Sequence, residues 1–137
     1  MTKVLGVDYG DVRTGLAVSD ALGKLASSAG VIEGYNMDKV AEAVAAKARE
    51  AGAGVIVLGF PKNMNNTLGP RAEKTLLFKA ALEVRFEGEV ILRDERGTTV
   101  SATRMLNDTN TRGKKRKAVI DAVAATVILQ DYLDSLR

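Results

Sequence analysis

Short apolar runs separated by polar turns predict several strands along the chain. Runs rich in Val and Leu predict strands over Lys3–Tyr9 and Gly15–Ser19, and the turn residues between them predict a hairpin. A weaker strand is expected over Lys24–Ile32. The continuous apolar run Gly54–Phe60 is typical of a buried parallel strand, and Glu89–Arg93 is expected to be another strand.

Helices are expected between and after these strands. They are predicted over residues 37–51, from 69 or 70 to about 84, from 98 or 99 to about 106, and from about 116 to 136, with polar loops over 62–68 and from 107 to about 115. Asn36 offers an N-cap for the first helix, Gly52 closes it, and Pro70 suits the first turn of the second. This alternation predicts an α/β protein with a central mixed sheet, an N-terminal hairpin and flanking helices.

The composition restricts both the class of protein and its chemistry. A length of 137 residues allows about one domain, here residues 1–137, with ordinary globular contents of 46% hydrophobic and 27% charged residues. The chain has no Cys and no His, which excludes disulfides, thiolate or histidine catalysis, and metal sites built on these ligands. An enzyme of this composition must rely on carboxylates, lysines, hydroxyls, backbone amides or a hard metal ion bound through oxygen.

Positive charge is concentrated in one stretch of the chain. Residues 1–92 carry 11 basic and 11 acidic side chains, whereas residues 93–117 carry 8 basic and 3 acidic ones. Within this stretch lies a run that we call the basic cluster: Arg112, Lys114, Lys115, Arg116 and Lys117. Such a run is either a solvated loop or a contact for a polyanion such as nucleic acid. With 4% aromatic residues and no Trp, base stacking is not the main binding mode.

Two acidic residues lie where the surrounding sequence is apolar. Asp8 follows Val4 and Gly6 on one face of the first strand, where a core residue is normally apolar. Either it has a functional role, or the strand ends here and Asp8 caps the turn at Gly10. Asp121 lies in a helix that is apolar on all sides, so it faces a functional site or forms an ion pair with Lys117.

A third acidic position follows the strand that ends near residue 93. Asp94 and Glu95 point to opposite faces of an extended chain, so at most one of them joins a shared site, and the spacing does not choose between them. Carboxylates from two strands and a helix form a set of oxygen ligands suited to Mg²⁺ or Mn²⁺. Such ions stabilise the attacking and leaving oxygens of a phosphoryl displacement, for which the basic cluster would hold the phosphates.

Five motifs give the chain a family resemblance. They are G-V-D-Y-G-x-x-R-T-G-L-A-V-S-D at Gly6–Asp20, G-F-P-x-N-M at Gly59–Met64, G-P-R-A-E-K at Gly69–Lys74, D-E-R-x-T-T at Asp94–Thr99, and D-A-V-A-A-x-V-I-L-Q-D-Y-L at Asp121–Leu133. In this order and over nearly the whole chain they resemble the YqgF (RuvX) family. Its members are ribonuclease H-like proteins described as Holliday junction resolvases and as nucleases that mature the 5′ end of pre-16S rRNA.

The resemblance implies a site and a substrate class. It assigns the catalytic and metal-binding acids to Asp8, Glu95 and Asp121, with Mg²⁺ or Mn²⁺ as cofactor. It makes Arg13 and Arg96 candidate phosphate contacts beside the basic cluster. The implied function is hydrolysis of phosphodiester bonds, foremost in pre-16S rRNA during ribosome biogenesis, with resolution of branched DNA as the alternative. Gly97 and Leu68 depart from residues common in the family, but neither is one of the acids.

Other readings of the sequence remain open at this point. A G-x-D-x-G hairpin also opens the sugar kinases and actin-like ATPases, but these need two such domains. A non-catalytic nucleic-acid-binding protein would not require all three acids. The sequence does not choose between RNA and DNA, or between a monomer and the homodimer that paired cuts in a junction require. No apolar run approaches the ~20 residues of a membrane span, so a cytoplasmic protein without membrane contact is expected.

Overall fold

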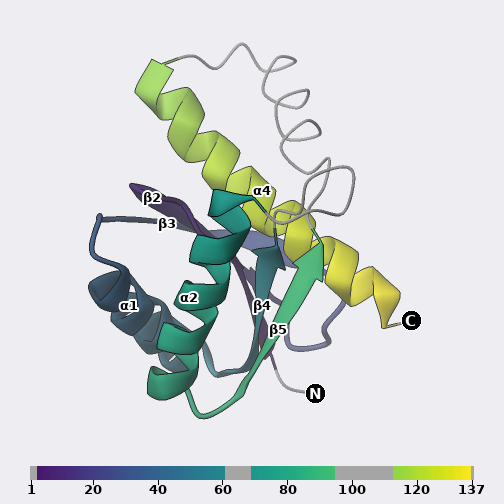
Figure 1. Ribbon diagram of the computed structural model, residues 1–137. Helices are drawn as coiled ribbons and strands as arrows, with labels where there is room; N and C mark the ends of the chain where they lie inside the picture. Colours follow the sequence, from purple (N-terminus) through teal and green to yellow (C-terminus); the bar gives the residue numbers. More distant parts are fainter. Residues whose placement is uncertain (1–2, 61–68, 95–112, 137) are drawn as a thin grey trace.

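Five strands form one mixed sheet in the computed structural model, which describes residues 3–60, 69–94 and 113–136, those at 113–122 by their backbone alone (Figure 1). The strands are β1 Lys3–Asp8, β2 Arg13–Ser19, β3 Ala26–Glu33, β4 Ala53–Phe60 and β5 Glu89–Asp94, and the helices are α1 Met37–Ala51, α2 Pro70–Arg85 and α4 Gly113–Ser135. The strand order is β3-β2-β1-β4-β5.

The parallel strands end at the same edge of the sheet. β1 pairs antiparallel with β2, which pairs antiparallel with β3, so the predicted N-terminal hairpin is confirmed. β4 pairs parallel with both β1 and β5, with Val7 opposite Leu58 and Phe60 opposite Asp94. The ends of β1, β4 and β5 therefore lie side by side, and we call this side of the sheet the carboxyl edge.

Helices cover both faces of the sheet. α1 and α2 pack on one face, over a core that includes Leu5, Leu58 and Phe78. α4 crosses the other face, over a second core that includes Val57 and Leu129 (Figure 1). Because side chains alternate along a strand, odd positions of β4 from Val55 onward face α4 and even positions face the two shorter helices.

The first two helices begin as their sequences predict. Asn36 accepts a hydrogen bond from the Lys39 N–H at 3.0 Å, which caps α1, and Gly52 ends this helix in the left-handed conformation at φ 73°. α2 begins with Pro70 in its first turn, after Gly69 as the N-cap residue.

Glycine at position 6 allows α4 to lie directly against β1. A Cβ atom built at Gly6 would be 2.7 Å from the Leu129 Cβ and 3.1 Å from the Ala125 carbonyl oxygen. The contact with Leu129 is closer than packed carbon atoms tolerate and the contact with the Ala125 oxygen is tight, so a side chain here would force the helix or the strand to shift. The absence of a side chain at this one strand position sets how closely α4 approaches the centre of the sheet.

A glutamine side chain fixes the other half of α4. Gln130 donates from Nε2 to the Lys24 carbonyl at 2.9 Å and accepts from the Ala26 N–H at 2.9 Å. These two bonds tie the helix to the start of β3. Because they join residues more than 100 positions apart in the chain, they hold α4 in register on the sheet.

Three elements begin two or more residues away from the prediction, namely β2, which begins at Arg13 instead of Gly15, β3 and α4. Lys24 and Leu25 belong to a turn rather than to β3, because their N–H groups donate to Asp20 Oδ1 at 2.8 and 3.3 Å. The Lys24 hydrogen bond is the main cause that holds the pKa of Asp20 below its usual value. α4 begins at Gly113 instead of Arg116, because Lys and Arg are good helix formers and the basic cluster does not break a helix.

Two predicted segments cannot be compared, since the polar loop at 62–68 and the helix from 98 or 99 to 106 lie outside the described residues. Among the helices that are described, none combines the length and the apolar character needed to cross a membrane.

The close contact at Gly6 can be tested by substitution. Gly6→Ala is expected to lower the free energy of unfolding by about 1–3 kcal/mol, because the new methyl group collides with Leu129. Urea unfolding measures this change. Gly34→Ala is the matched control, since its Cβ would meet Val40 at an ordinary 3.4 Å. Equal stability of the Gly6→Ala variant and the unmodified protein would show that α4 does not lie this close to β1.

Candidate active site

A buried carboxylate ends the central strand of the sheet. Asp8 is the last residue of β1, is 6% exposed, and pairs with Gly15 of β2. It follows Val4 and Gly6 on the face that α4 covers. The strand thus ends at Asp8, as one of the two interpretations of the sequence expects, and in the turn that follows the Gly10 N–H donates to Thr14 Oγ1 at 3.5 Å.

Glycines lie on both sides of Asp8 on this face. Gly15 is its partner on β2, and Gly59 follows Leu58, the partner of Val7, on β4. Val57 belongs to the core under α4, so alternation gives Gly59 the same orientation. Both glycines are buried. As a result, neither neighbouring strand places a side chain beside the Asp8 carboxylate.

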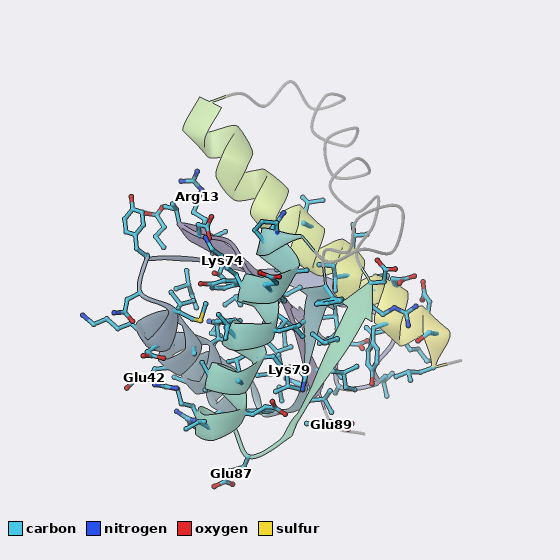
Figure 2. The ribbon with its side chains drawn as sticks, viewed as in Figure 1. Arg13, Glu42, Lys74, Lys79, Glu87 and Glu89 are labelled. Carbon is cyan, nitrogen blue, oxygen red and sulfur yellow. The ribbon has the colours of Figure 1, made fainter. Side chains whose placement is uncertain are left out.

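The turn after β1 carries the first predicted cation. A Cβ atom at Gly10 would lie 2.2 Å from the Arg13 carbonyl oxygen, so this tight turn requires glycine. Arg13 is half-buried and begins β2 (Figure 2). By alternation from Ala17 it faces α4, as Asp8 does. The hairpin thus brings two predicted site residues to one face of the carboxyl edge.

A second cation reaches Asp8 from α2. Nη2 of Arg71 lies 3.4 Å from Asp8 Oδ1 and 3.4 Å from the Tyr9 carbonyl oxygen. The Arg71 side chain is 55% exposed, against 8% for Asp8. The sequence patterns did not single out Arg71 as a candidate site residue. Its signal was a cation in the first turn of a helix, where the positive end of the helix dipole disfavours it.

Aromatic stacking fastens the hairpin to α2. The Tyr9 and Phe78 rings are 4.1 Å apart at 15°. Lys74 of α2 and Asp11 of the turn also form an ion pair at 3.0 Å (Figure 2). Burial raises the pKa of the Tyr9 hydroxyl and the Asp11 carboxylate adds to the rise, whereas Lys74 opposes it.

At the end of β5, Arg93 and Asp94 point to opposite faces of the sheet. Arg93 donates from Nε to Asp131 of α4 at 2.9 Å, so it faces that helix. Asp94 points the other way, as does Leu92, which packs against the core under α1 and α2. A cavity of about 450 Å³ lies here between β5 and α4. Glu95 is the next residue and lies outside the described range.

The remaining predicted residues are described in part or not at all. Asp121 lies in α4 one helical turn before Ala125, the residue whose carbonyl approaches Gly6. The basic residues at 114–117 lie in the first turns of α4, with only their backbone described. Arg96 and Arg112 fall outside the described residues. Among the side chains that are described, no three carboxylates form a metal-binding group.

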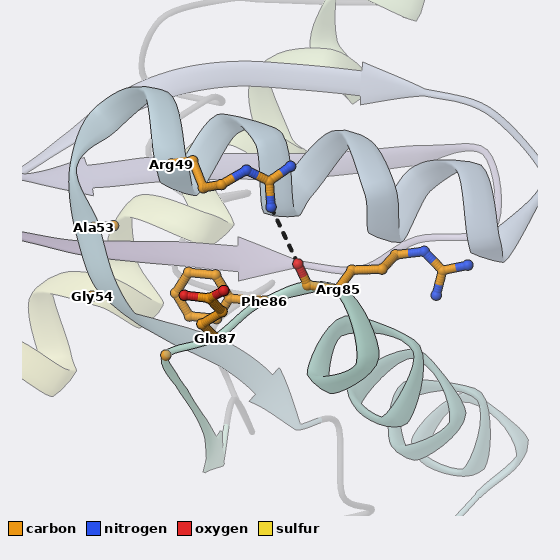
Figure 3. A pocket seen from close by; sticks show the side chains of 7 residues that line it. Arg49, Ala53, Gly54, Arg85, Phe86 and Glu87 are labelled. Carbon is orange, nitrogen blue, oxygen red and sulfur yellow. Dashed lines mark hydrogen bonds between the residues drawn. The ribbon is translucent and has the colours of Figure 1, made fainter.

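A second cavity of about 450 Å³ lies at the opposite edge of the sheet, where α1 and α2 end (Figure 3). Its two guanidinium groups take part in holding these helices together. Arg49 donates to the Arg85 carbonyl at 3.1 Å, and Arg85 donates to the Ala81 carbonyl at 2.9 Å. Arg85 also pairs with Asp38 at 3.7 Å. We assign this cavity to the packing of the fold.

Comparison with known proteins places the chain among nucleases. A family model described as "RuvX: Holliday junction resolvase" matches residues 2–135. The chain is 49% identical to a Lactiplantibacillus plantarum protein named "Putative pre-16S rRNA nuclease", over 96% of this chain and 94% of that one. It is 46% identical to a Geobacillus protein of the same name, over 97% and 98%.

The fold is also similar to that of a solved resolvase. Thermus thermophilus RuvC, in complex with a Holliday junction substrate, superposes with a TM-score of 0.59 at 12% identity. The match covers 99% of this chain and 96% of that one. This likeness, together with the mixed sheet and its flanking helices, confirms the predicted ribonuclease H-like fold.

The surroundings of Tyr9 predict that its hydroxyl group loses its proton at a higher pH than an ordinary tyrosine. In ultraviolet difference titration, one of the three tyrosines should ionise above its usual value near 10, and Tyr9→Phe should remove that step. Because this pKa is raised on folding, its contribution to stability is present below pH 10 and is lost as the pH rises through the raised pKa. Tyr35→Phe, at an exposed position, should leave the late step in place. Persistence of that step in Tyr9→Phe would contradict the assignment.

Proposed function

The chain belongs to the RuvX family, and from this premise we propose that it is a metal-dependent nuclease that hydrolyses phosphodiester bonds in structured nucleic acid. The observation that carries the proposal is the Asp8 carboxylate. It is buried at the end of the central strand, between two glycines, on the face against which α4 packs. A buried carboxylate costs free energy that this position could avoid with an apolar residue, so a functional role accounts for it.

We assign the metal ligands to Asp8, Glu95 and Asp121. Arg93 faces α4 and Asp94 faces away, which argues against Asp94 as the ligand and favours Glu95, the residue that the family motif assigns. Asp121 precedes by one turn the part of α4 that contacts Gly6. These relations support three carboxylates converging from β1, β5 and α4.

The donor set fits a hard divalent cation. All three proposed ligands are carboxylates, and the sequence offers no imidazole or thiolate that would favour a softer metal. Mg²⁺ or Mn²⁺ held there would lower the pKa of a water nucleophile and stabilise charge on the leaving oxygen. Because Gly15 and Gly59 flank Asp8, the two neighbouring strands add no side chain directly beside it, which suits an ion that keeps several of its waters.

The cations are proposed to hold the sugar–phosphate backbone. Arg13 shares the face of Asp8, and Arg96 directly follows the proposed ligand at position 95. The basic cluster continues into the first turns of α4, which extend beyond the strands of the sheet (Figure 1). From Gly113 to Asp121 the helix rises about 12 Å, so phosphate binding and hydrolysis would occur along one helix.

The substrate that we propose is the 5′ end of pre-16S rRNA, matured in the cytoplasm during ribosome biogenesis. The names of relatives 41–49% identical over nearly their full length support this choice. Resolution of Holliday junctions is the second candidate, favoured by the description of the matching family. A junction needs two paired cuts and therefore two active sites, as in a homodimer, whereas trimming an RNA end needs one.

Removing a proposed ligand should abolish cleavage. With Mg²⁺ or Mn²⁺, Asp8→Asn and Asp121→Asn should each lower turnover at least about a hundredfold, because each loses a carboxylate that holds the ion. The assay follows labelled precursor rRNA and labelled junction DNA. Asp38→Asn, in the first turn of α1, is the matched control. Unchanged turnover in both ligand variants would refute the metal site.

The same assay separates the two substrates when sedimentation is measured beside it. The proposal expects the precursor RNA to be cut at its 5′ end. A monomer that cuts only RNA removes the junction alternative. A dimer that makes paired cuts in the junction and leaves the RNA intact would replace our choice with that alternative. Binding of both substrates without cleavage of either would favour the non-catalytic binding protein.

Binding by the basic cluster predicts a defined salt dependence. If all five cations contact duplex phosphates, log affinity falls with log salt with a slope of magnitude up to about 4.5. Replacing the five residues with Gln should flatten this slope, measured by fluorescence anisotropy. The control replaces Lys39 and Lys47 of α1, which should leave the slope unchanged. An unchanged slope in the cluster variant would place binding elsewhere.

A further inference from the structure

Arg71 occupies a position that helix electrostatics disfavours. It is the second residue of α2, and the N-cap residue Gly69 has no side chain to accept from the first N–H groups. The positive end of the helix dipole therefore remains beside a cation. An acidic residue is the usual choice here, and Glu73 supplies one in the same turn. A cation at this position needs a nearby anion to offset its repulsion by the helix dipole.

The anion present in the structure only partly meets this need. The Arg71 guanidinium approaches Asp8 and the Tyr9 carbonyl, and both distances, at 3.4 Å, are longer than a strong charge-assisted hydrogen bond. More than half of the Arg71 side chain is exposed, whereas Asp8 is almost fully buried. The guanidinium thus contacts the buried carboxylate from one side and faces solvent on the other.

The neighbouring ion pairs of α2 have a different character. Lys74 and Asp11 meet at 3.0 Å, and Lys79 and Glu83 at 3.2 Å, with the acid half or more exposed in each pair. Such exposed pairs contribute little to stability. Arg71 instead joins an exposed cation to the one buried carboxylate among the described residues.

We propose that Arg71 is a substrate-contacting residue, whose guanidinium binds a non-bridging oxygen of the nucleic-acid phosphate that lies at Asp8. This inference rests on the proposed nuclease function. Guanidinium offers a planar fork that matches phosphate oxygens, and its loose contact with Asp8 leaves donors for that role. Without substrate, the same contact balances the charge of Asp8, so Arg71 and a divalent cation oppose each other at this carboxylate.

Two measurements without turnover test Arg71. Anisotropy with a labelled RNA duplex in chelator reads phosphate binding, and electron paramagnetic resonance with Mn²⁺ alone reads the carboxylate site. Arg71→Gln should flatten the log–log salt slope by about 0.9, the value for one phosphate contact. It should also tighten Mn²⁺ binding by about threefold to tenfold, because a positive charge near the ion is removed.

Two further variants show whether the guanidinium itself matters. Arg71→Lys keeps the charge and should keep the salt slope, but it should lower turnover on cleavable RNA at least about tenfold because the planar fork is lost. Lys79→Gln removes one charge from the same helix, farther from the carboxyl edge, and should change none of the three readouts (Figure 2). Thermal unfolding checks that each variant is folded.

The outcomes separate this inference from the proposed function. If Arg71→Gln keeps the original salt slope, or binds Mn²⁺ no more tightly than Lys79→Gln does, the role of Arg71 is refuted even where the protein cuts RNA. If Arg71→Gln changes the salt slope and the Mn²⁺ affinity as expected, but the unmodified protein cleaves neither substrate, then Arg71 contacts phosphate and only the proposed nuclease function is refuted.

Discussion

The contact between α4 and β1 at Gly6 determines where the functional elements can meet. A helix normally stands off from a sheet by the length of the side chains between them, but here the Ala125 carbonyl and the Leu129 Cβ reach the strand backbone. Small residues on α4 and on the neighbouring strand β2, among them Ala125 and Ala17, keep the layer thin. Because the helix lies this close, a short Asp side chain one turn earlier in α4 suffices for the proposed site at the end of β1.

The burial of Asp8 sets a second constraint, between stability and function. A carboxylate removed from water must find compensating charge, and Arg71 supplies part of it from outside the core. Stacked Tyr9 and Phe78 rings and an Asp11–Lys74 ion pair join the turn after β1 to α2. These contacts hold the residues that follow Asp8 against the helix that carries Arg71.

Much of the fold could be predicted because its signals are local. The bounds of α1 follow from an N-capping Asn36 and a left-handed Gly52, both of which act within a few residues. The start of α4 was predicted three residues late, because a cationic run was read as a loop although its residues favour helix. The strand after the hairpin shifted, because Asp20 forms a turn that hydropathy does not reveal.

The site was predictable only where a residue stands out in its own segment. Asp8 does so, as a carboxylate in an apolar strand. Arg71 does not, since its partner is 63 residues away, and the pairing exists only once α2 packs beside the hairpin. The sequence pattern could not choose between Asp94 and Glu95, because the choice depends on which residues at the end of β5 face α4, and Arg93 is one that does. Which side chains meet in the site depends on how distant segments pack and pair, and this does not show in the local sequence.

The glycines on either side of Asp8 also bear on how easily a substitution could remove the cleavage activity. Gly15 and Gly59 lie in strands beside the buried carboxylate, and neither has the positive φ that would require glycine. In the proposed site, a single side chain at either position would crowd the Asp8 carboxylate and leave the positive charge of the basic cluster unchanged, so cleavage would be lost before nucleic-acid binding.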